Sequence, residues 1–376
     1  MKTWPTASLG DAAEIVAGQS PRGDQILDTP ATFPFHQGVR DFGRWQPTTR
    51  TYCDRPPRLA KAGDVLISVR APIGRVNVAT TTVGIGRGLM ALRGGAHLET
   101  MFLAYFLESL KPRWNEFESS GSVFANLGRS DLANIQIPLP AIEEQRAIVF
   151  TLGALDDKIE SNQRFVELIP QLIRAIVSDK LDVESREVRV VDLAKFINGG
   201  AFTKGASGTG RMVIRIAELN SGPGNSTVYS DMDVPKERTA CFGDLLMSWS
   251  GSLDIYRWVL DEAIINQHIF KVLPSDGYPS WLVFDRLSAV MPIFQGIARD
   301  KATTMGHIQR GHLESTTIGI PSSESLRQLN VLLAPLWEML LLAEKENVTL
   351  AALRDTLIPE LLSGRIRVPE VQGIPA

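Results

Sequence analysis

The sequence predicts an internally duplicated α+β protein in which two β-rich modules are separated by two long helices. Three observations predict this fold class. The chain has 376 residues, which at about 150 residues per domain leaves room for two or three domains. Several segments recur at a spacing of 180 or 181 residues, and two stretches carry a sustained helical pattern.

The composition is that of a soluble globular chain, with 44% hydrophobic and 22% charged residues. No apolar run approaches the roughly 18 residues that a membrane-spanning helix needs, and residues 1–10 lack the apolar core of a signal peptide. Two cysteines, Cys53 and Cys241, cannot form a disulfide framework or a four-ligand zinc site. We therefore expect a cytoplasmic protein without a transmembrane helix.

The duplication rests on four pairs of matching segments. The pairs are residues 9–18 with 190–199, residues 62–68 (AGDVLIS) with 242–248 (FGDLLMS), Ile85 and Leu89 with Ile265 and Ile269, and residues 132–140 with 313–321. A period this long indicates two copies of a whole module rather than a solenoid, and it predicts pseudo-two-fold symmetry within the chain. We place the first β-rich module at residues 1–140, the first helix at 141–185, the second module at 186–321, and the second helix with the C-terminal tail at 322–376.

Within each module, short β-rich runs alternate with glycine and proline turns. Residues 64–69 and 244–249 are the clearest predicted strands. The apolar spacing also predicts short helices over residues 98–110 and 281–289.

Both long helical segments carry apolar residues at alternating steps of three and four, which is the spacing of a coiled-coil seam. The first seam is Leu152, Leu155, Ile159, Asn162, Val166, Ile169, Ile173 and Ile176, and the second is Leu329, Leu333, Leu336, Leu340, Ala343, Asn347, Leu350 and Leu357. Thirty-odd residues give a rod of about 50 Å. Two such rods in one chain most simply pair as an antiparallel coiled coil, and the alternative is that they are ordinary core helices.

The end of the second helix repeats the junction that follows the first. Residues 363–368 (SGRIRV) correspond to 178–183 (SDKLDV), which lead into the second module. We therefore expect Ile366 and Val368 to pack near residues 4–9 and to close the chain into a circle.

A second apolar stripe on the first helix, formed by Phe165, Leu168 and Leu172, lies off the seam. One helix partner would leave it exposed, and exposed apolar stripes commonly mark interaction sites. This stripe is a candidate subunit interface. Burial against the chain's own module is the competing explanation.

The sequence lacks a recognisable catalytic motif. Residues 84–88 (GIGRG) do not have the context of a dinucleotide or methyl-donor loop, so we interpret them as a structural turn. There is no Walker loop, GxSxG, HExxH or [DNS]PP[YFW] motif, the five histidines are scattered, and Ser68 and Ser248 have no evident base. These absences favour a binding or assembly function over an enzyme.

The order of motifs resembles the specificity subunit of type I restriction-modification enzymes. The residues that carry the resemblance are LGD at 9–11 with Gly18, GDVLIS at 63–68, GSVF at 121–124, IPLP at 137–140, EQRAI at 144–148, LDDKIE at 155–160 and LLSGRI at 361–366. The resemblance covers essentially the whole chain. The second module departs from the pattern, because Arg70-Ala-Pro becomes Ser250-Gly-Ser and Glu144-Gln-Arg becomes Ser325-Leu-Arg.

This resemblance implies that the β-rich modules are target recognition domains, each recognising one half of a bipartite, asymmetric DNA site, and that the helices set the spacing between the halves. It implies two modification subunits, which bind S-adenosylmethionine and methylate adenine, and optionally two restriction subunits that use ATP. The chain itself would bind no cofactor or metal and would be non-catalytic.

The distribution of charge bears on DNA contacts. The net charge is −3, yet residues 1–140 hold 3 Lys and 12 Arg against 12 Asp and Glu, a balance of +3. Arginine suits forked recognition of phosphates and base edges, although an ordinary solvated surface would show the same content. Our candidate DNA contacts are Arg40, Arg44, Arg70, Arg75 and Arg87 in the first module, and Arg215, Arg257, Gln267, His268 and Arg310 in the second.

Two other functions stay open on sequence alone. A duplicated coiled-coil adaptor that does not bind DNA would share the repeat and the helices. A self-sufficient modification enzyme is disfavoured by the missing catalytic motifs, and methyl transfer by the purified chain would support it. Salt-dependent binding to a split DNA sequence would separate the recognition subunit from the adaptor.

Overall fold

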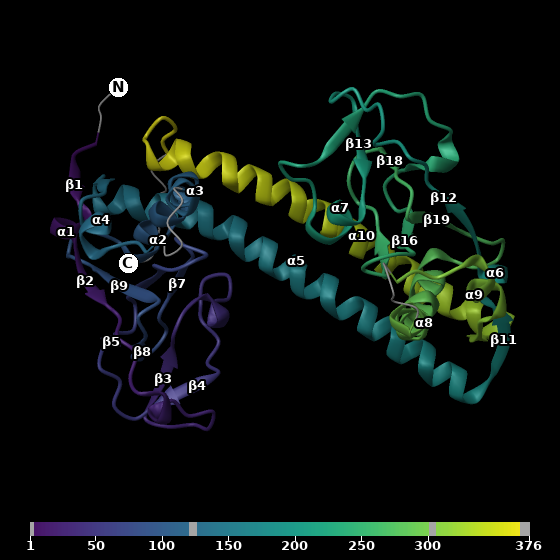
Figure 1. Ribbon diagram of the computed structural model, residues 1–376, viewed down its shortest axis with the longest axis horizontal. Coiled ribbons are helices and arrows are strands. Elements are labelled where there is room, and N and C mark those ends of the chain that lie inside the picture. The colour runs from purple at the N-terminus through teal and green to yellow at the C-terminus, as the bar shows by residue number, and fades with distance from the viewer. Residues whose placement is uncertain (1–3, 120–125, 301–305, 369–376) are drawn as a thin grey trace. The chain divides into compact units, whose positions relative to one another are not determined.

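The computed structural model describes residues 4–119, 126–300 and 306–368. The chain divides into two units (Figure 1). Unit 1 comprises Met1–Lys158 and Ala351–Ala376, and unit 2 comprises Ile159–Leu350. The long helices α5 (Ile142–Val183) and α10 (Ser323–Leu362) each contribute one part to both units. The GSVF motif at 121–124 lies outside the described residues.

Unit 1 contains three small sheets with strand orders β1-β10, β2-β9-β6-β7 and β4-β3-β8-β5. All the pairings are antiparallel except that of β3 with β8, which is parallel. The strands are β1 (Thr6–Ser8), β2 (Ala13–Ala17), β3 (Phe33–His36), β4 (Thr51–Cys53), β5 (Leu59–Ala60), β6 (Val65–Ser68), β7 (Val76–Val78), β8 (Val83–Ile85), β9 (Leu89–Gly94) and β10 (Gln136–Pro138). The helices, besides α5 and α10, are α1 (Leu9–Ala12), α2 (Thr100–Ser109), α3 (Lys111–Ser119) and α4 (Arg129–Ala133).

Unit 2 repeats this topology strand for strand. Its sheets have the orders β11-β20, β12-β19-β16-β17 and β14-β13-β18-β15, and again one pairing, that of β13 with β18, is parallel. Its strands are β11 (Ser185–Arg189), β12 (Ala194–Asn198), β13 (Arg211–Ile214), β14 (Val228–Ser230), β15 (Thr239–Ala240), β16 (Leu245–Ser248), β17 (Ile255–Arg257), β18 (Ala263–Ile265), β19 (Ile269–Pro274) and β20 (Thr317–Pro321). Its other helices are α6 (Val190–Leu193), α7 (Ile216–Ser221), α8 (Ser280–Asp300) and α9 (Arg310–Ser315). The duplication predicted from the sequence is therefore a duplication of the fold.

The central strands of each module form where the sequence predicts them. The four residues of β6 and the four residues of β16 are all buried, which explains their continuous apolar runs. Helix α2 begins where the side chain of Glu99 accepts a hydrogen bond from the backbone N–H of Phe102 at 2.6 Å. Helix α8 is longer than the nine residues predicted, because it continues through Pro292 to Asp300.

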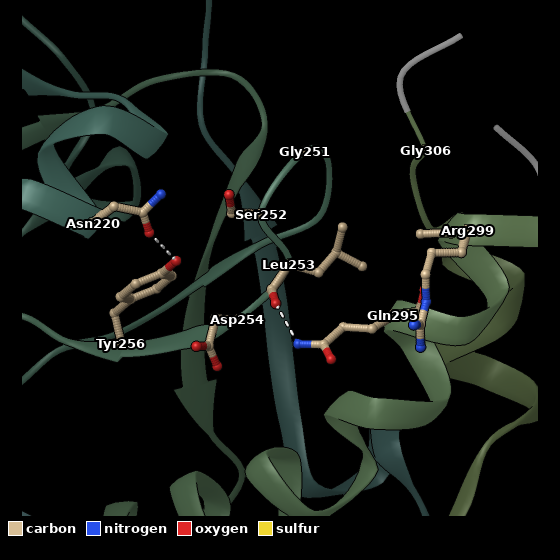
Figure 2. A pocket seen from close by; sticks show the side chains of 10 residues that line it. Asn220, Gly251, Ser252, Leu253, Asp254, Tyr256, Gln295, Arg299 and Gly306 are labelled. Carbon is tan, nitrogen blue, oxygen red and sulfur yellow. Dashed lines mark hydrogen bonds between the residues drawn. The ribbon is translucent and has the colours of Figure 1, made fainter. Parts of the chain in front are cut away.

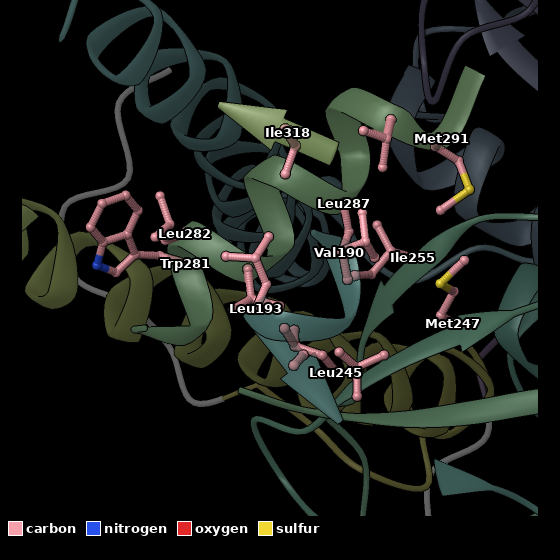
Figure 3. Close-up of a cluster of buried hydrophobic side chains, with 14 of the residues drawn as sticks. Val190, Leu193, Leu245, Met247, Ile255, Trp281, Leu282, Leu287, Met291 and Ile318 are labelled. Carbon is pink, nitrogen blue, oxygen red and sulfur yellow. The ribbon is translucent and has the colours of Figure 1, made fainter. Parts of the chain in front are cut away.

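Each unit has its own hydrophobic core, to which the long helices contribute. In unit 1, Ile148 and Leu152 of α5 and Leu361 of α10 belong to the same buried cluster as Leu103 of α2 and Val65 of β6. The core of unit 2 combines residues of its strands with residues of α6, α8 and the parts of α5 and α10 that belong to this unit; part of it is drawn in Figure 3. The labelled members there are Val190, Leu193, Leu245, Met247, Ile255, Trp281, Leu282, Leu287, Met291 and Ile318.

The two long helices exceed the predicted length of thirty-odd residues, with 42 residues in α5 and 40 in α10. At 1.5 Å per residue each is about 60 Å long. Every position of both predicted seams is buried or half-buried. The most apolar 18-residue window of α10 reaches a mean hydropathy of 1.3, so by length and composition this helix could cross a membrane, which the sequence analysis did not expect. A core helix passes the same test, and 39% of that window is buried inside the protein.

The two ends of the described chain meet inside unit 1. The indole N–H of Trp4 donates to Glu144 Oε2 at 3.1 Å, and Arg367 Nη1 donates to Glu144 Oε1 at 2.9 Å. The guanidinium of Arg367 lies 5.4 Å from the centre of the Trp4 ring, and both Trp4 and Val368 pack against the unit 1 core. Ile366, in contrast, is exposed.

Candidate nucleic-acid interface

A small cavity in unit 1 lies where several strands end. It has a volume of about 190 Å³, and its walls come from residues that follow β2, β3 and β6 and from the connection between β8 and β9. The lining residues are Ser20, Gln37, Gly38, Val39, Ser68, Arg70, Ala71, Arg87 and Gly88. The cavity brings together Arg70 and Arg87, two of the candidate DNA contacts, and adds Gln37, which the sequence analysis did not select.

Glycines allow the connection between β8 and β9 to approach its neighbours. A Cβ atom at Gly88 would lie 2.3 Å from the carbonyl oxygen of Gln37, and one at Gly18 would lie 2.2 Å from the carbonyl oxygen of Gly86. The backbone N–H of Gly86 donates to the carbonyl of His36 at 2.8 Å. The glycine-rich segment is thus a structural turn, as predicted, and it fixes the position of Arg87.

Four of the five first-module candidates have exposed guanidinium groups with no carboxylate within ion-pairing distance among the described residues. They are Arg40, Arg70, Arg75 and Arg87. Arg40 directly follows the cavity residue Val39, and the backbone N–H of Arg75 donates to Ser68 Oγ at 2.9 Å in the turn that follows Arg70. A guanidinium without an internal partner keeps all its donors for phosphate or base acceptors.

Arg44, the fifth candidate, is engaged inside unit 1. Its Nη1 lies 2.6 Å from Glu108 Oε1, its Nη2 lies 3.2 Å from Asp156 Oδ1, and its guanidinium stands 4.4 Å from the centre of the Trp45 ring. These partners belong to α2, α5 and the Arg44 loop itself. Donors of Arg44 are thus directed toward protein carboxylates.

Asp156 is the centre of this network. Its two carboxylate oxygens accept hydrogen bonds from Tyr105 OH at 2.7 Å, Arg354 Nη1 at 2.9 Å, Trp45 Nε1 at 3.0 Å and Arg44 Nη2 at 3.2 Å. Burial acts to raise the pKa of Asp156, but the charge of Arg44 and the hydrogen bonds from its neighbours outweigh burial and hold the pKa below its usual value. Burial, with the adjacent Asp156 carboxylate, raises the pKa of Tyr105, so its hydroxyl remains a donor.

In the second module, all three candidate arginines have carboxylate partners. Arg215 Nη2 lies 2.6 Å from Glu218 Oε1 and 2.7 Å from the carbonyl of Ser226. Arg257 Nε lies 2.9 Å from Glu344 Oε2. Arg310 is highly exposed, with Glu314 at 3.3 Å on the same helix. An exposed pair of this kind is weak, so the guanidinium of Arg310 can exchange partners readily.

Gln267 and His268 lie on the connection between β18 and β19, the counterpart of the turn that carries Arg87. Gln267 is exposed. His268 adopts a left-handed backbone with φ of 80°, and its Nδ1 is buried without a hydrogen-bond partner among the described residues. Trp249 packs against His268 with ring centres 5.0 Å apart and stands 6.4 Å from His307, so this edge of the second module is aromatic.

A larger cavity of about 540 Å³ adjoins the turn after β16 (Figure 2). Asn220 and Tyr256 line one side and Gln295 and Arg299 the other, and Tyr256 OH donates to Asn220 Oδ1 at 2.7 Å. In unit 1 the corresponding turn is covered by Trp114, because a Cβ atom at Gly74 would lie 2.0 Å from the Trp114 ring. The two modules therefore differ in the space left beside equivalent turns.

Ser68 and Ser248 are structural residues of those turns. Ser68 Oγ donates to the carbonyl of Pro72 at 2.7 Å, and Ser248 Oγ donates to the carbonyl of Ser252. Among the described residues, no group of three or more His, Cys, Asp or Glu side chains is placed to hold a metal ion. Cys53 is buried and Cys241 is exposed. The observed geometry supplies hydrogen-bond donors and positive charge at strand ends, which is suited to binding.

The candidate interface stripe on α5 is partly exposed. Leu168 and Leu172 are 60% and 45% exposed, whereas Phe165 packs against the core of unit 2. Exposed apolar side chains also occur along α10, at Val331, Leu332, Met339, Leu342, Val348 and Leu353. Phe165 thus packs against the chain's own module, whereas Leu168 and Leu172 stay a candidate subunit interface.

The chain is similar to known proteins, over about half of its length in some matches and nearly all of it in another. Residues 1–171 match the family described as "Type I restriction modification DNA specificity domain". The putative type I restriction enzyme MjaX specificity subunit of Methanocaldococcus jannaschii is 36% identical over 178 residues, a match that covers 46% of this chain and only 42% of that relative. The type I restriction enzyme MjaIX specificity subunit of the same organism is 22% identical over 98% of this chain and 95% of its own.

A solved structure has the same fold. The S subunit of a type I restriction-modification system from M. genitalium aligns over 96% of both chains with a TM-score of 0.64 and 15% sequence identity. The mixed helix and sheet content with two β-rich parts agrees with this likeness. Residues 1–171 match the model of the type I restriction modification DNA specificity domain, and the chain as a whole is similar to the specificity subunits of type I restriction enzymes.

Proposed function

We propose that this chain is a non-catalytic DNA-recognition subunit of a type I restriction-modification complex. In this proposal each β-rich module recognises one half of a bipartite, asymmetric DNA site. The observation that carries the proposal is the unit 1 cavity, where Arg70 and Arg87 reach the ends of adjacent strands without carboxylate partners among the described residues. Loops at strand ends, held by a rigid scaffold, are common positions for binding residues.

The candidate contacts fall into two groups under this proposal. Arg40, Arg70, Arg75 and Arg87, together with Gln267, contact bases or phosphates directly, because their side chains are exposed at strand ends. His268, which is half-buried beside Gln267, is a further proposed contact. Arg44, Arg215 and Arg257 hold recognition loops through their ion pairs. Arg310 contacts phosphate, since its pairing with Glu314 is exposed and weak.

We further propose that α5 and α10 form an antiparallel coiled coil that sets the spacing between the half-sites. Within unit 1, Asp156 of α5 bonds to Arg354 of α10, and within unit 2, Asn162 Nδ2 donates to Glu346 Oε2 at 2.7 Å. The partner positions thus descend along α10 as they ascend along α5, which supports antiparallel pairing. The division of the chain after residues 140, 185 and 321 and the pseudo-two-fold symmetry belong to the same proposal. So does the circular closure of the chain, which the contacts of Trp4 with Glu144 and Arg367 support.

The proposed partners are double-stranded DNA, two modification subunits and, optionally, two restriction subunits in the cytoplasm. S-adenosylmethionine and ATP would be bound by those subunits. The exposed Leu168 and Leu172, with Phe165 at the edge of the core, are the proposed contact for a partner subunit. Half-sites recognised from one side of a duplex lie about 34–36 Å apart, and helices of about 60 Å can span that distance.

The test is a long-read methylome of the host with and without this gene. Loss of one bipartite adenine-methylation motif on deletion, and its return on complementation, is the expected result. A methylome that does not respond to deletion, in cells that express the modification subunits, would contradict the proposal and favour the adaptor.

A further inference from the structure

The turns that carry Arg87 and Gln267 have corresponding backbone hydrogen bonds in the two modules. In unit 1, the N–H of Gly86 bonds to the carbonyl of His36, and the N–H of Val69 bonds to the carbonyl of Gly88. In unit 2 the N–H of Asn266 bonds to the carbonyl of Ile214, and the N–H of Trp249 bonds to the carbonyl of His268. Three of these four residues lie 180 positions after their counterparts in unit 1, and Ile214 lies 178 positions after His36. Arg87 therefore occupies the position of Gln267, and Gly88 that of His268.

The side chains at these equivalent positions differ in chemistry. The first module has Arg70, Arg87 and Gly88, whereas the second has Ser250, Gln267 and His268. An arginine fork matches the O6 and N7 acceptors of guanine, and a glutamine amide matches the N6 donor and N7 acceptor of adenine.

We infer that Arg87 and Gln267 are equivalent specificity-determining residues, Arg87 selecting guanine in the first half-site and Gln267 selecting adenine in the second. This inference rests on the proposed function and adds the base that each module selects. It requires that both side chains be available to DNA, that neighbouring groups fit the same base pair, and that the turn hold each residue in place.

In the first module, the feature that meets these conditions is the cavity lined by Arg70 and Arg87. Arg87 is exposed beside the cavity of about 190 Å³, which Gly38 and Gly88 also line. The backbone N–H of Arg87 donates to Ser20 Oγ at 3.2 Å, which fixes the start of the side chain. Arg70, on the opposite turn, supplies a second cation that has no carboxylate partner among the described residues, so the cavity favours a base edge that carries acceptors, as guanine does in the major groove.

The second module meets them with an aromatic surface. The backbone N–H of Gln267 donates to the carbonyl of Gly200 at 2.7 Å, and the exposed Gln267 directly precedes His268, whose ring packs against Trp249. Trp249 is anchored by its indole N–H, which donates to Asn198 Oδ1 at 3.0 Å. An apolar surface beside a glutamine fits an A·T pair, because the thymine methyl group projects into the major groove next to the adenine acceptor and donor.

The test exchanges the two residues in the full chain, assembled with its modification subunits. Complexes that contain wild type, Arg87→Gln or Gln267→Arg are titrated with the methylated motif and with duplexes that carry each single base-pair change. The readout is the ratio of affinities at each position, which a uniform loss of binding leaves unchanged. Arg189→Gln is the control, because Arg189 is an exposed arginine of a module surface that pairs with Asp192 at 2.8 Å.

We expect wild type to prefer guanine at one position of the first half-site by about 5- to 150-fold, and Arg87→Gln to abolish or change that preference at that position alone. Gln267→Arg should convert one adenine preference in the second half-site to guanine. Arg189→Gln should leave all ratios unchanged.

Three results are distinguishable. If wild type binds no motif and restores no methylation, the proposed function itself fails. If Arg87→Gln weakens binding equally for every duplex, Arg87 holds a phosphate and the inference is wrong. If wild type recognises a motif and Arg87→Gln changes neither the ratios nor the affinity, Arg87 does not contact DNA, and the inference is likewise overturned.

Discussion

Replacing Asp156 with alanine should destabilise unit 1 strongly, because four donors lose their acceptor. Tyr105, which is 1% exposed, would retain a buried hydroxyl with no partner, and the half-buried indole of Trp45 would lose its carboxylate. Arg44 and Arg354 keep Glu108 and Asp355 as partners, so their loss is smaller.

The magnitude follows from these partners. A buried donor left unsatisfied costs about 1–3 kcal/mol, and breaking a buried ion pair by removing one member costs about 3–5 kcal/mol. We expect Asp156→Ala to reduce the free energy of unfolding by about 3–5 kcal/mol. Tyr105→Phe removes one hydrogen bond to a charged acceptor and should cost about 1.5–3 kcal/mol in wild type but close to nothing in the Asp156→Ala background.

Denaturant unfolding of the four proteins of this double-mutant cycle, followed by tryptophan fluorescence, measures both quantities. Strictly additive effects of the two substitutions, or a loss below about 1 kcal/mol for Asp156→Ala, would refute the assignment of Asp156 as the centre of the network.

The same carboxylate gives this stability a pH dependence. The pKa of Asp156 is lowered in the folded state, so the folded protein binds this proton less readily than the unfolded chain does. The stabilisation is present above the unfolded-state pKa of about 3.9 and is lost as the pH falls through the lower, folded-state pKa. The difference in unfolding free energy between wild type and Asp156→Ala should therefore shrink below about pH 4, and a difference that is constant from pH 7 to pH 3 would contradict the lowered pKa.

Three other predictions concern packing. Gly153→Ala should stabilise the chain by about 0.5–1 kcal/mol, because a Cβ atom at this position inside α5 meets nothing within 4 Å. Gly18→Ala should destabilise the chain, because its Cβ atom would lie 2.2 Å from a backbone oxygen. Melting curves compare the two variants, and equal shifts in melting temperature would refute the argument. Deleting residues 365–376 removes the contact of Arg367 with Glu144 and should lower the melting transition of unit 1, and an unchanged transition would count against closure. The double variant Leu168→Ser and Leu172→Ser should weaken co-purification with modification subunits while leaving the melting temperature within about 2 °C, and full retention of those subunits would exclude this surface.

Much of the fold was accessible from the sequence because the duplication shows each module twice. Residues 64–69 and 244–249 are apolar on both faces, so their strands are predicted in both copies and correspond to β6 and β16. The apolar spacing predicted only residues 281–289 of helix α8, which extends to Asp300 past Pro292, a residue at which a helix commonly ends. Here the helix continues, at the cost of one backbone hydrogen bond, because Phe294 and Ala298 beyond the proline are buried in the core of unit 2.

The candidate site was less accessible, because counts of charge do not show which carboxylate lies opposite an arginine. Arg44 and Arg70 look alike in the sequence, yet Arg44 faces Glu108, 64 residues away, and Asp156, 112 residues away. Gln37 was missed because it joins Arg87 only through the parallel pairing of β3 with β8. Trp249 at the position of Val69 was the one sequence signal that pointed to the aromatic edge of the second module.

Unit 1 is built from two distant parts of the chain, and this arrangement limits the order in which the two units can fold during synthesis. The core of this unit includes Ile358, Leu361 and Leu362. One hydrogen-bond donor of Asp156, Arg354, lies 198 residues later in the sequence. Unit 2 is continuous from Ile159 to Leu350, so all its residues leave the ribosome before Arg354 does. The core of unit 1 therefore begins to be synthesised before unit 2 and is completed after it, and until residues 358–362 emerge part of the apolar surface that they cover in unit 1 is left open.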